Sequence, residues 1–159
     1  MVWENDASTW WLGSVTAPFS RALLERFIES GQDIYADKQI RFMLDSKSSG
    51  YWTIVGAVDI YDFDPRNLRA GVGIIIDENH RRSGHASNGL NLLKGYAFKY
   101  LSLHQLYAEV PVSNTASFRL FQNSGYVMSE KKSDWIKGDK GWEDVLCMQL
   151  FNNTVKQAI

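Results

Sequence analysis

The sequence predicts a mixed α/β (α+β) fold, and three stretches of the chain carry that prediction. Residues 71–100 have the pattern of a strand, a basic glycine-bearing turn and an amphipathic helix. Residues 39–60 have the pattern of two strands joined by a turn, and residues 126–151 contain a second such pair. Helical and strand-like segments alternate without a repeat or a linker, so we expect a single domain over residues 1–159.

The composition excludes several classes of function. A length of 159 residues suits one core of ordinary size, and 45% hydrophobic with 22% charged residues is typical of a soluble globular protein. The formal net charge of -1 gives no basic excess, so we expect no nucleic-acid partner. The single Cys147 rules out an internal disulfide and suits a reducing compartment. No membrane-spanning run or signal peptide is recognisable, so we expect a cytoplasmic protein without a membrane partner.

The first part of the chain predicts helices followed by a hairpin. Residues 3–16 hold three tryptophans among small polar residues and predict a short helix plus a loop. Residues 18–30 predict a helix, because Pro18 suits a first turn and Gly31 can end the helix. Residues 39–45 and 51–60 predict strands, with a turn at 46–50 between them and an irregular acidic connection over residues 61–69.

The next stretch predicts a strand, a loop and a helix. Val72 to Ile76 form an apolar, β-branched run that predicts a buried strand. Residues 77–85 form a polar turn, and from Ala86 the apolar residues recur at helical spacing. A helix start offers free N–H groups and a positive dipole end, so this arrangement suits an anion.

Two features of the turn strengthen the expectation of a phosphate site. Gly84 and Ala86 keep side-chain bulk away, and Arg81 and Arg82 add positive charge. The two common nucleotide signatures, Gly-x-Gly-x-x-Gly and the P-loop, are both absent. The alternative is that both arginines are ordinary solvated charges.

The last part of the chain predicts a strand, a short helix and a hairpin. Residues 106–112 alternate as a strand does, and Pro111 within them removes a ladder donor, so strand pairing is expected to fail or bulge there. Residues 114–123 predict a helix with Ser113 or Asn114 as its cap and Gly125 after its end. Residues 126–151 predict two strands with a turn at 137–141.

In this order, the segments resemble the GNAT superfamily of N-acetyltransferases. Arg81-Arg82-Ser83-Gly84-His85-Ala86 is similar to the acyl-CoA loop of that family, Arg/Gln-x-x-Gly-x-Gly/Ala. The second half resembles the ribosomal-protein N-terminal and spermidine/diamine acetyltransferases, over a match of roughly residues 3–151. The segments that carry this likeness are Val58-Asp59-Ile60, Gly73-Ile74-Ile75-Ile76-Asp77, Leu103-His104-Gln105-Leu106-Tyr107 and Asn114-x-x-Ser117-x-x-Leu120-Phe121-x-x-x-Gly125-Tyr126.

The resemblance implies a fold and a donor. The fold would be a mixed, mostly antiparallel sheet with splayed central strands, flanked by helices, and its first strand would be missing from this chain. The donor would be acetyl-CoA, its pantetheine arm pairing with the central strand and its pyrophosphate held by the loop. The residues implied in cofactor binding are Ile74, Ile75, Ile76, Arg81, Arg82, Ser83, Gly84, His85, Ala86, Ser87, Asn114, Ser117 and Phe121.

Two positions depart from the family pattern. Phe121 stands where many relatives have a tyrosine that protonates the leaving thiolate. Gly71 stands near the position where relatives often have a glutamate on the central strand. An acyl-CoA-binding module with little or no turnover is therefore the alternative to an enzyme.

Three residues are candidates for catalysis. Asp59 lies in an apolar strand, where a lone carboxylate is costly unless it is paired, so it is the first candidate for the base or for amine binding. Glu109 is either plain surface or a base near the splayed strands. Tyr126 could replace the missing phenol, and a core tyrosine is the alternative. Asn114 can be a helix cap, a cofactor ligand or both.

The acceptor is expected to be an amine. The resemblance implies direct attack of a primary amine on the thioester, and the amine is a polyamine, another small amine or a protein N-terminus. The three histidines have no metal-ligand spacing, so no metal is expected. A missing strand would leave an exposed sheet edge, which favours a homodimer.

Overall fold

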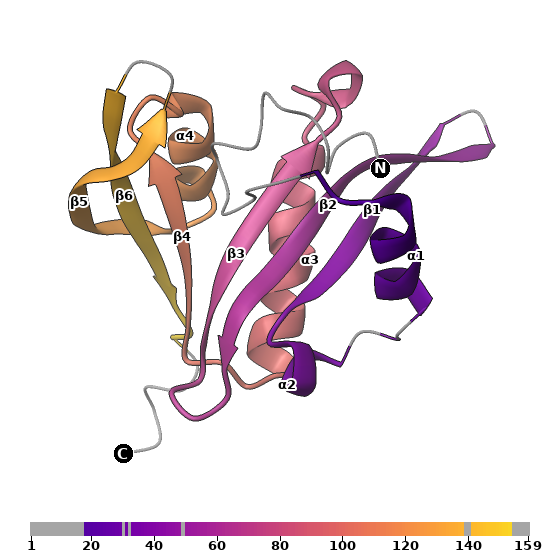
Figure 1. Ribbon diagram of the computed structural model, residues 1–159, viewed down its shortest axis with the longest axis horizontal. Coiled ribbons are helices and arrows are strands. Elements are labelled where there is room, and N and C mark those ends of the chain that lie inside the picture. Colours follow the sequence, from indigo (N-terminus) through magenta and orange to yellow (C-terminus); the bar gives the residue numbers. More distant parts are fainter. Residues whose placement is uncertain (1–17, 30, 32, 49, 139–140, 154–159) are drawn as a thin grey trace.

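The computed structural model describes residues 18–29, 31, 33–48, 50–138 and 141–153. Within them lies a six-stranded sheet with the order β1-β2-β3-β4-β6-β5 (Figure 1). Every pair of neighbouring strands is antiparallel except β3 and β4, which are parallel. The predicted mixed, mostly antiparallel sheet flanked by helices is thus confirmed.

The elements occur in the predicted order. The strands are β1 (Ile40–Ser48), β2 (Tyr51–Asp64), β3 (Arg69–Ile76), β4 (Gln105–Pro111), β5 (Val127–Gly138) and β6 (Gly141–Phe151). The helices are α1 (Arg21–Glu29), α2 (Ile34–Asp37), α3 (His85–Lys99) and α4 (Thr115–Asn123), with a 3-10 turn η2 (Glu78–His80) after β3.

The core lies between the sheet and α3. Successive side chains of a strand point to opposite faces, and alternate residues of β2 and β4 are apolar. Val58, Ile60, Leu106, Ala108 and Val110 are at most 2% exposed, and they pack with the buried stripe of α3, which comprises Leu90, Leu93 and Ala97. Figure 1 shows α3 running along one face of β2 and β3. One face of the sheet is therefore a closed apolar layer.

Two predicted connections are partly strand. The first strand continues to Ser48 rather than ending at residue 45, and β2 continues to Asp64 where an irregular segment was expected. The connection between β2 and β3 is shorter than predicted, because the Asp64 carboxylate closes a tight turn by accepting hydrogen bonds from the backbone N–H groups of Arg66 and Asn67. The acidic residues that suggested a loop include the one that closes the turn.

The start of the first helix is also corrected. The hydroxyl oxygen of Ser20 accepts the backbone N–H of Leu23, as an N-cap does, so α1 begins at Arg21 and Pro18 precedes it. The predicted short helix and loop over residues 3–16 lie outside the described residues. The expectation that a first strand is missing concerns the same segment and stays a prediction.

Pro111 has a different effect from the one predicted. The pairing of β4 with β6 continues through Pro111, opposite Val145, without a shift of register. The backbone N–H of Val112 donates to Asp144 O of β6, so alternate residues of β4 face β6 and Pro111 faces the β3 side. On that side the pairing has already ended at Tyr107. The prediction of a failed ladder at Pro111 was wrong, because its missing donor faces no described strand.

Candidate active site

The two central strands separate after a short contact. Parallel pairing of β3 with β4 covers only Arg69, Ala70 and Gly71, opposite Gln105, Leu106 and Tyr107. Beyond this point the ribbons of β3 and β4 diverge (Figure 1). We call the region between residues 72–76 of β3 and residues 108–111 of β4 the interstrand gap.

One edge of β3 faces this gap with open backbone groups. The N–H of Asp77 donates to Val55 O of β2, so Ile75 also directs its backbone to β2, where it pairs with Ala57. Ile74 and Ile76 direct theirs to the gap, and no described strand pairs with them there. Of the three predicted cofactor positions on β3, Ile74 can offer its backbone groups to an extended ligand, the Ile76 carbonyl already accepts a hydrogen bond from Arg81, and the backbone groups of Ile75 are engaged with β2.

The loop after β3 leads to the start of α3. Asp77 accepts hydrogen bonds from the backbone and side chain of Asn79, which fix the turn η2. Arg82 and Gly84 have φ values of 61° and 80°, and Gly84 is the N-cap of α3 without a side-chain hydrogen bond. The predicted helix start at Ala86 is therefore one residue late, since α3 begins at His85.

This helix start has the features of an anion site. Arg81, Arg82, Ser83, Gly84 and Ser87 are exposed, and a Cβ added at Gly84 would meet no atom within 4 Å. The Arg81 Nε donates to Ile76 O at 3.2 Å, so this guanidinium lies at the end of β3. Free N–H groups, a helix dipole and two arginines here suit a phosphate. The predicted pyrophosphate contacts of residues 81–87 remain predictions.

The start of α4 lies on the other side of the gap. The Asn114 Oδ1 accepts the backbone N–H of Ser117 at 3.1 Å, so Asn114 is the helix cap. Both residues are half-buried. Phe121 is 4% exposed and packs edge-on against Tyr126, with ring centroids 5.0 Å apart. Cofactor contacts of Asn114 and Ser117 remain predictions, and a contact of Phe121 would require its ring to leave the core.

Tyr126 lies in the same apolar core. It is 4% exposed, and burial raises the pKa of its phenol. A buried phenol that packs on Phe121 in the main apolar core is poorly placed to meet a substrate. This position favours the core-tyrosine alternative over the catalytic one.

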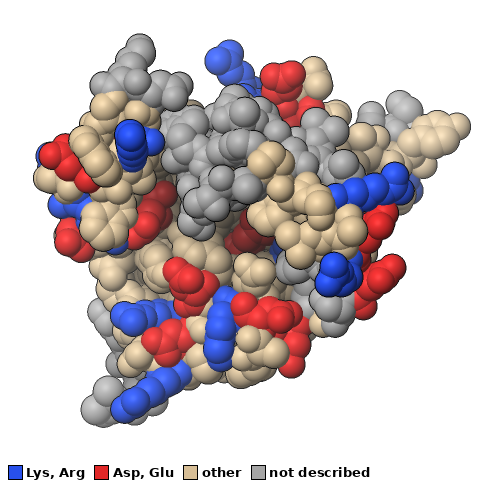
Figure 2. Space-filling model, viewed as in Figure 1, with Lys and Arg blue, Asp and Glu red and all other residues tan. Residues whose placement is uncertain are grey.

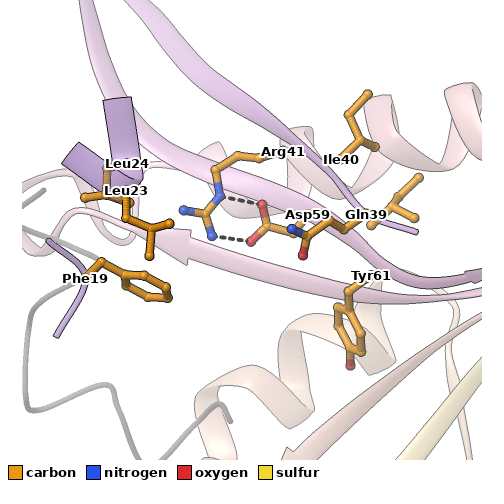
Figure 3. A pocket seen from close by; sticks show the side chains of 9 residues that line it. Phe19, Leu23, Leu24, Gln39, Ile40, Arg41, Asp59 and Tyr61 are labelled. Atoms are coloured by element: carbon orange, nitrogen blue, oxygen red, sulfur yellow. Dashed lines mark hydrogen bonds and ion pairs between the residues drawn. The ribbon is translucent and has the colours of Figure 1, made fainter. Parts of the chain in front are cut away.

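The face of the sheet opposite α3 is polar where it meets α1. A cavity of about 310 Å³ lies between the chain around α1 and strands β1 and β2 (Figure 3). Its lining residues are Phe19, Leu23, Leu24, Gln39, Ile40, Arg41, Asp59, Ile60 and Tyr61. The cavity thus combines an apolar wall with one ion pair and one phenol.

The ion pair accounts for the first catalytic candidate. Arg41 Nε and Nη2 donate to the two carboxylate oxygens of Asp59, at 2.6 and 2.7 Å. The hydrogen bond with Asp59 raises the pKa of Arg41, and the carboxylate charge adds to this, against the cost of burial. A bidentate partner neutralises Asp59 and fixes its orientation. The pair fits a structural or orienting role better than that of a base, and the prediction of a base at Asp59 is untested.

Glu109 also has a partner. Its carboxylate accepts a hydrogen bond from Lys132 of β5, and this bond raises the pKa of the lysine. The Lys132 Nζ lies 4.5 Å from the ring centroid of Trp135, within cation–π range. Glu109 faces the α1 side of β4, and as a base it would first have to leave Lys132.

Two tyrosines on this face were not predicted as site residues. Tyr61 of β2 and Tyr107 of β4 meet edge-on, with ring centroids 6.0 Å apart. Tyr61 was assigned to an irregular connection, which concealed that it shares a strand face with Asp59. The alternation Asp59-x-Tyr61 was the available signal once β2 was extended by a few residues.

Other kinds of site find no support among the described residues. No group of three or more His, Cys, Asp and Glu side chains in the described ranges could hold a metal ion. No helix of the described chain is long and apolar enough to cross a membrane. On the face seen in Figure 2, the acidic and basic side chains of the described residues are interspersed and form no continuous field of one sign.

Comparisons with known proteins agree with this geometry. A family model described as an acetyltransferase (GNAT) domain matches residues 1–127. A probable N-acetyltransferase of Bacillus subtilis (strain 168), YjcK, is 24% identical over 129 residues, which are 80% of this chain and 70% of that protein.

Solved structures share the fold. The spermidine N-acetyltransferase from Vibrio cholerae in complex with CoA and spermine has a TM-score of 0.78 and 22% identity, covering 93% of this chain and 85% of that one. A dodecameric structure of spermidine N-acetyltransferase from the same organism, in an intermediate state, has a TM-score of 0.74 and 22% identity over 89% of this chain and 80% of that one.

Proposed function

The chain belongs to the GNAT acetyltransferase family, and we propose that it transfers acetyl from acetyl-CoA to a primary amine. The acceptor is a polyamine or other small amine, or the N-terminal amine of a protein. The alternative is a module that binds acyl-CoA with little or no turnover.

The observation that carries the proposal is the continuity of the interstrand gap with the loop at α3. The gap begins at Gly71 and Tyr107, where the pairing of β3 with β4 ends, and follows the open edge of β3 past Ile74 and Ile76. The end of β3 contacts the guanidinium of Arg81, and the loop that follows leads to the start of α3, where no side chain caps the N–H groups. A ligand with an extended amide-bearing arm that ends at a pyrophosphate, as in acetyl-CoA, matches both parts.

The reaction does not require a strong general acid from the protein. A neutral amine attacks the thioester carbonyl, a C–N bond forms, and the C–S bond breaks as the thiolate leaves. An unperturbed thiol has a pKa of about 8.5, so the thiolate is a tolerable leaving group and water can protonate it. The phenylalanine at position 121 is therefore compatible with turnover.

A thiol-release assay tests the transfer. Purified protein is given acetyl-CoA with spermidine, putrescine, an alanine-starting peptide or an aminoglycoside, and free thiol is measured over time. We expect release that depends on one of these classes of amine, which would identify the acceptor class. Binding of acetyl-CoA by calorimetry with no release for any amine would favour the non-catalytic alternative.

A matched pair of variants tests the pyrophosphate loop. Gly84→Glu and Gly84→Gln impose the same bulk and the same strain at a positive φ, and they differ only in charge. We expect Glu to weaken acetyl-CoA binding about tenfold more than Gln, with a difference that shrinks at high salt. Equal effects would place the pyrophosphate elsewhere.

The expected homodimer also remains a prediction. Within the described sheet, β1 has a neighbouring strand on one side only, and an open strand edge favours association. Light scattering coupled to size-exclusion chromatography would measure the mass of the particle.

A further inference from the structure

The side chain of Tyr61 crosses the central strand. Tyr61 is paired with Gly71 of β3, and its ring lies over the Cα of this glycine. A Cβ added at Gly71 would lie against the ring, 2.5 Å from its Cζ, which real contacts do not allow. A side chain at position 71 and the ring in its present place therefore exclude each other.

The hydroxyl end of Tyr61 lies at the start of the interstrand gap. The ring contacts Tyr107, the last residue of β4 that pairs with β3. Glu109, two residues further along β4, is close enough for its charge to help raise the pKa of this phenol. In Figure 3 the side chain points away from the Arg41–Asp59 pair that it flanks in the cavity lining. Tyr61 thus lines the α1 cavity and also lies beside the point where β3 and β4 separate.

The other polar groups on this face are engaged with one another. Asp59 is held by Arg41, Glu109 by Lys132, and the Tyr107 hydroxyl donates to Asp62 at 3.3 Å. An acceptor amine that enters from the cavity and a thioester that enters from the gap would meet beside Tyr61. A phenol oxygen can accept a hydrogen bond as well as donate one.

We propose that Tyr61 orients the acceptor amine, with its phenol oxygen accepting an N–H of the amine where the α1 cavity meets the interstrand gap. This inference rests on the proposed acetyl transfer. The held N–H directs the nitrogen lone pair at the thioester carbonyl, as near-attack geometry requires. The C–N bond forms as the C–S bond breaks. The amine loses its proton to solvent and the thiolate takes one from solvent, so Tyr61 ends the reaction unchanged.

The protonation of the phenol fits an orienting role. Burial and the neighbouring charges of Glu109 and Asp62 raise the pKa of Tyr61 above its ordinary value. The hydroxyl therefore keeps its proton at neutral pH. It can accept and donate hydrogen bonds there, but it cannot take up the proton of the amine.

Tyr61→Phe tests the inference with Tyr107→Phe as its matched control. The phenylalanine ring of the first variant can still cover Gly71, while the control removes the adjacent phenol that bonds Asp62. With the best of the four amines above, we expect kcat/KM for the amine to fall about tenfold or more in Tyr61→Phe and less than about twofold in Tyr107→Phe. The Kd for acetyl-CoA and the slow hydrolysis of acetyl-CoA without amine should stay at wild-type values.

Each other result overturns the inference in a distinguishable way. Wild-type kcat/KM in Tyr61→Phe would remove the orienting role and leave acetyl transfer standing. Parallel losses of acetyl-CoA affinity and amine-free hydrolysis would reveal a structural role. A displaced pH profile of kcat/KM would mean that the phenol gives up or takes up a proton during the reaction and does not merely orient the amine. Absence of thiol release by the wild-type protein with all four amines would overturn the proposed function and this inference together.

Discussion

The two faces of strands β2 and β4 differ sharply although they belong to the same backbone. Toward α3, the residues Val58, Ile60, Leu106, Ala108 and Val110 are at most 2% exposed. The opposite face begins with the buried Val55 and Ala57 of β2 and continues with Asp59, Tyr61, Tyr107 and Glu109, whose polar groups are half-buried or exposed. The face beneath α3 supplies stability, and the polar part of the opposite face borders the α1 cavity and the interstrand gap.

This difference indicates where the fold tolerates change. A side chain beneath α3 is buried and closely packed, so replacing it with a smaller side chain leaves a cavity. A residue beneath α1 is held by a specific partner instead: an arginine, a lysine or another phenol. Four experiments test the contrast between the faces, beginning with the largest expected effect.

Adjacent residues of β4 test the contrast directly. Leu106→Ala empties a site that is 0% exposed and should lower the free energy of unfolding by about 3 kcal/mol. Tyr107→Ala removes a half-buried ring from the other face and should cost about 1 kcal/mol. Urea unfolding of both variants measures the difference. Equal losses would mean that both faces are core.

The two glycines of β3 on the α1 face test the packing of Tyr61. Gly71→Ala places a methyl group in the ring of Tyr61, so we expect a loss of about 2 kcal/mol and reduced turnover. In Gly73→Ala the nearest atoms belong to Asp59 at 3.7 Å, an ordinary contact, so stability should change by less than about 0.5 kcal/mol. If Gly71→Ala behaves like Gly73→Ala, the ring does not occupy that space in solution.

Two ion pairs of different burial test the polar partners. Arg41→Gln leaves the partly buried Asp59 without its bidentate partner, and we expect a loss of about 1 to 2 kcal/mol. Lys131→Gln breaks an exposed pair with Asp144 and should cause no measurable change. Thermal unfolding at low and high salt compares them. A salt-sensitive loss in the lysine variant would contradict the ranking.

Alkaline pH should produce the smallest effect. Burial and the charge of Asp62 raise the pKa of Tyr107 from 10.0 to about 12. The unfolded chain then loses this proton first, so the stabilisation is complete below about pH 10 and is lost as the pH rises toward 12. The melting temperature of the wild type should fall more steeply over this interval than that of Tyr107→Phe. Identical slopes would show that the phenol titrates normally.

Much of the fold could be predicted because its signals are local. The stripe of α3, the β-branched run of β3 and the cap at Asn114 depend on residues a few positions apart, and each lies where it was expected. The turn at Gly84 was predictable for the same reason. The errors at residues 46–50 and 61–69 arose where strand pairing extended the elements beyond their local pattern.

The candidate site was less predictable than the fold. The partners of Asp59 and Glu109 are 18 and 23 positions away in the sequence, and no local rule connects them. Tyr61 was not predicted as a site residue because its position depends on Gly71, ten residues further along the chain. Only the register between β2 and β3 shows that the ring of Tyr61 occupies the space that a side chain at Gly71 would need.

The amino-acid sequence alone was enough for the order of the elements, the apolar face of the sheet and the basic, glycine-bearing loop at the start of α3, since each follows from composition and short-range spacing. The folded chain was needed to show that β3 and β4 part after three residue pairs, that Arg41 and Lys132 hold the two carboxylates, and that Tyr61 lies over Gly71. These are contacts between strands that are distant in the chain, and the register of pairing is settled only when the whole sheet packs against α3.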